Sequence, residues 1–175
     1  MGEVLEPVSE KVFKEQVTIR FKNINEGFDR FESFILKSAS GQSGDKDEQK
    51  FIEFIDRVFQ LNGQENSYID FYLSKLDKKA KENLFTSLNE DDKAILKRHI
   101  NEIEDETIYF RLQRELIPFI TRLCIREILF STFYFTKFPC TIWGNYNMRF
   151  PIFFDNVDNV NKYNEVLENC GLNLE

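Results

Sequence analysis

The chain has 175 residues, of which 42% are hydrophobic and 30% charged, and its formal net charge is −7. At about 100–200 residues per domain, this length predicts one domain over residues 1–175, and the composition excludes disordered and collagen-like classes. The acidic balance argues against a nonspecific nucleic-acid coat and a polybasic membrane anchor, so we expect neither nucleic acid nor a membrane as a partner.

Helical spacing dominates the first part of the chain. Apolar residues from Val17 to Ile35 recur at intervals of 4 and 3, which predicts one helix, although the alternation over Val17–Phe21 is a competing strand pattern. The Ser- and Gly-rich segment 38–45 predicts a flexible linker between this helix and the next. A second helix is predicted from Asp45 to a stop at Asn62–Gly63.

Capping signals predict three more helices. Ser67 with Asp70 predicts the start of a third helix. Asn89, followed by three acidic residues, predicts the N-terminus of a fourth helix that runs to about Ile103. A last helix is predicted over residues 156–170, ended by Gly171.

The segment 107–135 is apolar almost all round, which predicts a central helix with a kink or restart at Pro118. The stretch 116–135 inside it has the length of a membrane span, but it carries three charged residues and is therefore predicted to be a buried core helix. Segment 138–154 predicts a small hairpin or an irregular aromatic segment with a turn at Gly144–Asn145. The predicted fold class is thus all-α, a bundle of five to six helices around 107–135.

Charge is distributed unevenly along the chain. Residues 107–154 contain six basic and two acidic residues, a net charge of +4, and 13 of the 26 aromatic residues. On the predicted central helix, one stripe would carry Arg111, Glu115, Arg122 and Arg126. One interpretation is a ligand site for phosphate or carboxylate, and the other is a set of structural ion pairs with acids of neighbouring helices.

Catalytic and metal motifs are sparse. His99 is the single histidine, and we predict a boundary or surface position for it on the fourth helix. The three cysteines Cys124, Cys140 and Cys170 have no paired spacing, and the first residues lack an apolar signal region, so we expect free thiols in the cytoplasm. We expect no metal and no cofactor, and we favour a protein without enzymatic activity.

Two functional hypotheses lead, ahead of a third, weaker one in which the basic aromatic segment 107–154 binds single-stranded nucleic acid, against which the net charge argues. In the first, the chain is a cytosolic interaction or regulatory protein, similar in logic to acidic inhibitors and immunity proteins. It would bind a protein partner through an acidic helical face or through the aromatic segment with Trp143, Tyr146, Met148 and Arg149. In the second, segment 107–154 binds a small molecule or phosphate ligand, with or without an enzymatic step. An exposed aromatic patch would also favour a homodimer.

Overall fold

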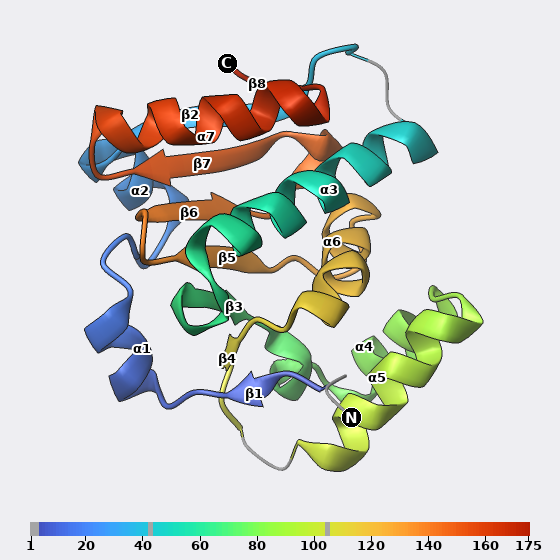
Figure 1. Ribbon diagram of the computed structural model, residues 1–175. Helices are drawn as coiled ribbons and strands as arrows, with labels where there is room; N and C mark the ends of the chain where they lie inside the picture. The colour runs from blue at the N-terminus through green and yellow to red at the C-terminus, as the bar shows by residue number, and fades with distance from the viewer. Residues whose placement is uncertain (1–3, 42–43, 104–105) are drawn as a thin grey trace.

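The computed structural model describes residues 4–41, 44–103 and 106–175 (Figure 1). In this part of the chain, eight strands form one antiparallel sheet with the order β1-β4-β3-β5-β6-β7-β2-β8. Helices pack against this sheet, so the fold is mixed α/β. The sequence-based prediction of an all-α helical bundle is therefore wrong.

The elements have the following bounds. The strands are β1 (Glu6–Pro7), β2 (Glu32–Ser38), β3 (Ser67–Asp70), β4 (Tyr109–Arg111), β5 (Thr132–Phe135), β6 (Cys140–Trp143), β7 (Phe150–Phe154) and β8 (Leu172–Leu174). The α-helices are α1 (Glu10–Gln16), α2 (Ile24–Arg30), α3 (Asp45–Asn62), α4 (Lys78–Thr86), α5 (Glu90–Glu102), α6 (Ile117–Ile125) and α7 (Val157–Cys170). Four short 3-10 helices are η1 (Gln64–Asn66), η2 (Tyr72–Lys75), η3 (Arg114–Leu116) and η4 (Tyr146–Met148).

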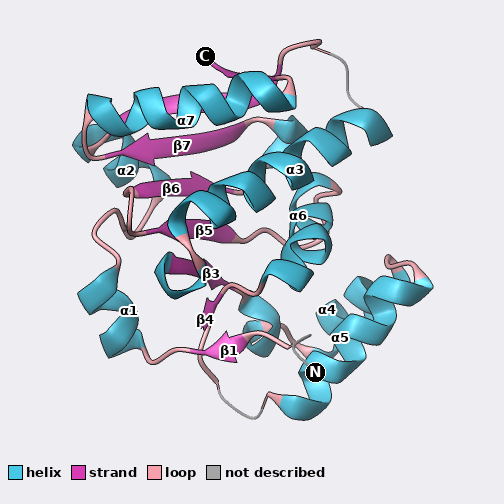
Figure 2. Ribbon diagram, in the orientation of Figure 1, coloured by secondary structure: helices cyan, strands magenta, loops and turns pink. Residues whose placement is uncertain are grey.

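The two faces of the sheet are covered by different parts of the chain. Helices α3, α6 and α7 lie over one face, where alternate strand residues such as Ile69, Phe133 and Ile142 join the main core (Figure 2). The opposite face carries Tyr68 and Tyr134, which pack with Phe13 of α1 in a second, smaller cluster. Because side chains alternate along a strand, the same central strands supply both clusters.

Segment 107–135 shows why the helical prediction fails. It contains β4, η3, α6 and β5 instead of one helix, and Pro118 lies in the first turn of α6, so the restart is confirmed. The residues of β5 are all buried, between β3 on one side and β6 on the other. A strand that is buried on both faces is apolar at every position. Its sequence therefore lacks the alternation that would distinguish it from a buried helix.

Two predictions in the first half of the chain are also wrong. The predicted helix up to Ile35 is replaced by α1, an extended segment, α2 and then β2, which begins directly after the C-cap residue Phe31. The predicted third helix at Ser67–Asp70 is strand β3, which pairs with β4 and β5. In both places, pairing with strands far away in the sequence overrides a locally helical pattern.

The remaining connections position the site described below. Strands β6 and β7 form the predicted hairpin, but residues 144–149 with η4 connect them instead of a two-residue turn at Gly144–Asn145. The predicted linker 38–45 connects β2 to α3, and its residues 42–43 lie outside the described residues. Among the described helices, none combines the length and the apolar character that crossing a membrane requires.

Candidate functional site

A pocket of about 390 Å³ lies at the end of the sheet where β3 and β6 finish and β5 begins. Figure 1 shows α6 next to this end of β5 and β6. Its lining comes from the strand ends, from the connection between α6 and β5, and from the connection between β6 and β7. We call it the aromatic pocket; its residues are Asp70, Tyr72, Leu129, Phe130, Ser131, Thr132, Trp143, Gly144, Asn145 and Tyr146.

Four aromatic rings line the aromatic pocket. Tyr146 is 59% exposed, and its ring meets that of Phe130 edge to face, with 4.7 Å between the centroids. Tyr72 is 40% exposed. Trp143 is half-buried, because its ring stacks on Phe21 at 5.5 Å. Large rings with an exposed face offer apolar contact at a small loss of rotamer entropy.

The two connections that line the pocket are held in a strained geometry. Glu127, Asn147 and Met148 all adopt left-handed backbone conformations, with φ of 57°, 57° and 52°. The backbone N–H of Asn147 donates to the carboxylate of Glu127 at 2.8 Å and so joins the two connections. Such conformations cost on the order of 1–3 kcal/mol each and persist where the surrounding structure enforces them, often at functional sites.

Gly144 fixes the second connection against the start of β5. Its backbone N–H donates to the carbonyl oxygen of Ser131 at 3.0 Å. A Cβ atom at position 144 would lie 2.6 Å from that same oxygen and 3.1 Å from Cys124 Sγ. Glycine is therefore required for this close approach, which brings Trp143 and Asn145 to the same pocket as Ser131.

A buried carboxylate forms part of the pocket lining. Asp70 is 3% exposed and accepts hydrogen bonds from the backbone N–H of Thr132 at 2.6 Å and from the hydroxyl of Tyr134 at 3.1 Å. Burial raises the pKa of Asp70 to about 6, against the lowering effect of these donors. With a pKa of about 6, the carboxylate is largely ionised at neutral pH.

The predicted partner-binding residues divide between two places. Trp143 and Tyr146 both line the aromatic pocket. Met148 and Arg149 instead line a neighbouring pocket of about 450 Å³ together with Lys37. Both basic side chains of that second pocket form ion pairs with Glu175.

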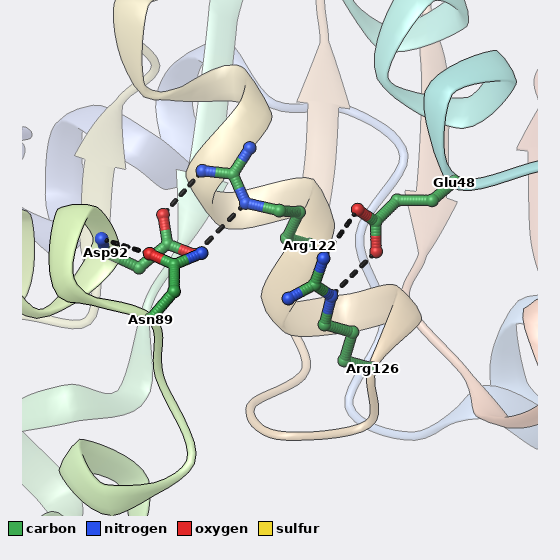
Figure 3. Close-up of polar contacts among 5 residues, drawn as sticks. All are labelled: Glu48, Asn89, Asp92, Arg122 and Arg126. Carbon is green, nitrogen blue, oxygen red and sulfur yellow. Dashed lines mark hydrogen bonds and ion pairs between the residues drawn. The ribbon is translucent and has the colours of Figure 1, made fainter. Parts of the chain in front are cut away.

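The predicted arginine stripe does not form a common site. Arg122 binds the buried carboxylate of Asp92 with two nitrogen atoms, one of them Nε at 3.0 Å (Figure 3). Arg126 binds Glu48 in the same two-pronged way, with Nε at 2.8 Å. Both guanidinium groups are thus occupied by acids from other helices, as the structural interpretation of the stripe requires.

The other two residues of the stripe lie on different elements. Arg111 belongs to β4, where its guanidinium lies over the ring of Tyr68 and donates to the carbonyl oxygen of Glu65 at 2.8 Å. Glu115 is exposed on η3. Since the segment is not one helix, its four charged residues share no common face.

The predicted position of His99 is wrong. The ring is 1% exposed; its Nε2 accepts the backbone N–H of Leu5 at 3.0 Å, so Nδ1 carries the proton that is donated to the carbonyl oxygen of Ile95. Burial lowers the pKa of this histidine. His99 thus connects the start of the chain to α5 and has no ring nitrogen left for another partner.

The cysteines and the acidic runs also serve the fold. The three cysteines are free and buried, and burial raises the pKa of the Cys124 thiol to about 12. In the acidic run at the start of α5, Asp92 is buried and Glu90 pairs with Lys93 at 2.8 Å. A second acidic run spans residues 102–106, and its residues 104–105 lie outside the described residues. Within the described ranges, no group of three His, Cys, Asp or Glu side chains has the geometry of a metal site.

Comparison of the chain with protein-family models, curated proteins and solved structures gives no match. The site is therefore interpreted from its own geometry. Sequence reasoning missed Asp70, Tyr72, Phe130 and Ser131. The available signal was the acid at position 70 inside the aromatic and apolar run Tyr68–Tyr72, a residue type that is rarely buried without a reason.

Proposed function

We propose that this protein is a non-enzymatic interaction protein with a regulatory or inhibitory role in the cytoplasm, and that it binds a protein partner at the aromatic pocket. The observation that carries the proposal is the exposed ring of Tyr146 beside the half-buried Trp143, at the mouth of a 390 Å³ pocket. Tyrosine and tryptophan next to a pocket are the residue types that most often dominate the binding energy of protein interfaces.

The backbone geometry supports the proposal. The bond between Asn147 and Glu127 and the close approach of Gly144 to Ser131 hold the pocket walls in place before any partner arrives. Preorganised walls reduce the entropy that is lost on binding and therefore favour affinity. The residues with left-handed backbone, Glu127, Asn147 and Met148, line the neighbouring pocket and belong to the same two connections as the aromatic pocket.

Charge indicates the kind of partner. The net charge of −7 favours association with a basic protein, because complementary charge accelerates encounter and disfavours acidic competitors. The acids in the first turn of α5 and the carboxylate of the aromatic pocket both contribute to this negative charge.

The test uses affinity capture from the host lysate at low salt, followed by native mass spectrometry. We expect the unmodified chain to retain a stoichiometric protein partner and Tyr146→Ala to lose it. Tyr146 is preferred to Trp143 for this test, because Trp143 stacks on Phe21 and its truncation would also lower stability. Val157→Ala is the matched control, since Val157 is 62% exposed on α7, outside the pocket lining.

The outcomes separate clearly. Loss of the partner with Tyr146→Ala, an unchanged melting temperature and retention by Val157→Ala would support the proposal. A partner that Tyr146→Ala retains fully would contradict the aromatic pocket as the interface. If the unmodified chain is instead found as a homodimer that Tyr146→Ala dissociates, the partner at the aromatic pocket is a second copy of this chain.

A further inference from the structure

The three buried aspartates of the described chain differ in how their charge is balanced. Asp47 pairs with Lys50 at 2.8 Å, and Asp92 pairs with Arg122. Asp70 is buried to the same extent, but no lysine or arginine in the described residues pairs with it. Buried charges in proteins are normally paired, so Asp70 is the exception that requires an explanation.

The hydrogen bonds of Asp70 orient the carboxylate without neutralising it. Its donors, the backbone N–H and the side-chain hydroxyl of Thr132 and the hydroxyl of Tyr134, are all neutral groups. A carboxylate has about four lone-pair positions on its two oxygens, so acceptor capacity remains after these bonds.

The aromatic pocket contains no basic residue that could balance the charge of Asp70. Four other pockets formed by described residues each contain a lysine or an arginine: Lys81, Lys37 with Arg149, Arg114, and Arg126 respectively. The aromatic pocket has an acid and four aromatic rings, but no basic residue. Aromatic faces attract organic cations through their quadrupole, and a nearby carboxylate adds a full counter-charge.

We propose that the aromatic pocket takes a basic side chain of the protein partner, with the Asp70 carboxylate as its counter-charge and the rings of Tyr72, Trp143 and Tyr146 around its alkyl stem and charged head. This inference rests on the proposed function and names the chemistry of the group that the partner inserts. A single carboxylate among aromatic rings is a poor set of ligands for a metal ion, which prefers several oxygen donors. A volume of 390 Å³ lies within the range of roughly 300–1,000 Å³ that ligand pockets occupy.

The inference implies a pH dependence. The titratable groups that interact electrostatically with Asp70 are Tyr72, Tyr109, Tyr134 and Cys124, and the pKa of each is raised above its ordinary value. Between about pH 4 and pH 8, Asp70 is therefore the group of this set that changes charge. A cationic ligand should bind more weakly as the pH falls through about 6, where Asp70 becomes protonated.

The single tryptophan of the chain makes the test direct. Trp143 lines the pocket, so its indole N–H gives one side-chain signal in a ¹H–¹⁵N spectrum of the full chain. The probes are n-propylguanidinium and n-butylammonium, and the matched neutral control is n-propylurea. We expect saturable shifts of the indole signal with both cations and none with the urea.

Variants identify the counter-charge. Asp70→Asn keeps the shape and a hydrogen-bonding side chain, and it should weaken cation binding about tenfold or more, the loss typical of a charged hydrogen-bond partner. Tyr146→Ala should weaken it through the loss of one ring, and Val157→Ala should leave it unchanged. Should Asp70→Asn fail to fold, the pH titration of the unmodified chain provides the same test.

Two results would overturn the inference: equal shifts with the urea and the guanidinium, or cation binding that neither Asp70→Asn nor acidification weakens. Failure of this inference is distinguishable from failure of the proposed function. If Tyr146→Ala loses the protein partner while the cationic probes do not bind, the interface stands and its cation chemistry is wrong. If the probes bind but no partner is captured, the cation site stands and the proposed function is wrong.

Discussion

Two buried aspartates, Asp92 and Asp70, show opposite uses of a carboxylate in the same fold. Asp92 is 2% exposed, bound by the two-pronged guanidinium of Arg122 and by the side-chain amide of Asn89 (Figure 3). Asp70 is 3% exposed and is bound only by neutral donors. The first charge connects α5 to α6, whereas the second belongs to a residue that lines the aromatic pocket.

The difference lies in how each buried charge is balanced. A buried ion pair satisfies both partners and is strongly destabilised when one of them is removed. A buried carboxylate without a cation destabilises the free protein at neutral pH, and we propose that at Asp70 a protein partner supplies the positive charge. The predictions below test whether this contrast between the two aspartates is real.

The largest effect is expected at the paired aspartate. Arg122→Met leaves the carboxylate of Asp92 buried without its cation and should lower the free energy of unfolding by about 3–5 kcal/mol. Urea unfolding at neutral pH measures this loss. In the double variant Arg122→Met/Asp92→Asn, part of the stability should return, because the uncompensated charge is gone.

Arg126→Met is the matched control, since it removes an arginine of the same helix that also binds an acid with two nitrogen atoms (Figure 3). Arg126 has a side chain that is 44% exposed, so its pair with Glu48 should contribute about 1 kcal/mol or less. Equal losses of unfolding free energy in Arg122→Met and Arg126→Met would show that burial of Asp92 does not increase the contribution of its ion pair to stability.

Local signals made several helices predictable from the sequence. Asn89 and Asn156 do accept the N-terminal backbone hydrogen bonds of α5 and α7, and Gly171 does end α7 in the left-handed conformation. The Asp45–Asn62 helix also has the predicted bounds. The caps of α5 and α7 are read correctly because the side chain and the backbone groups that it satisfies lie within a few residues of each other, whereas the cap signal of Ser67 with Asp70 falls in strand β3.

The sheet was not predictable in the same way. Strand β3 is flanked by β4 and β5, which lie at least 39 residues later, at positions 109–111 and 132–135 against 67–70. Local residue patterns do not indicate which distant segments pair with each other. The alternation over Val17–Phe21 does correspond to alternating burial, although that segment joins no strand of the sheet.

The candidate site was predictable only in part. Trp143 and Tyr146 are conspicuous as residue types, and the sequence places them in one short segment. Asp70 becomes notable only when the fold buries it without a cation, which depends on contacts with Thr132 and Tyr134 more than 60 residues away. The charge balance of a buried group depends on tertiary contacts. From the sequence alone, Asp70 was therefore interpreted only as part of a helix-capping signal.

A second prediction concerns the unpaired aspartate. Because the pKa of Asp70 is raised in the folded state, its contribution to stability is present below about pH 4 and is lost as the pH rises through about 6. Asp70→Asn should therefore equal the unmodified chain near pH 4 and exceed it near pH 8 by up to about 3 kcal/mol. Urea unfolding at the two pH values measures the difference.

The exposed acid Asp29 provides the control, since Asp29→Asn should change stability little at either pH. Asp70→Asn with lower stability than the unmodified chain near pH 8 would contradict an uncompensated charge at this position. It would show instead that the carboxylate is well balanced by its neutral donors, as Asp92 is balanced by Arg122.

The smallest effect is expected at the buried histidine His99. Burial lowers the pKa of His99 in the folded state, so the unfolded chain binds its proton first, and stability is lost as the pH falls below about 6.5. This slope opposes that of Asp70 and should emerge in the Asp70→Asn background, measured by urea unfolding between about pH 7 and pH 5. Adding His99→Gln should flatten it, because glutamine can accept the Leu5 N–H without titrating. A slope that survives His99→Gln would assign the acid sensitivity to other groups and would leave the ring's bond to Leu5 as a packing contact alone.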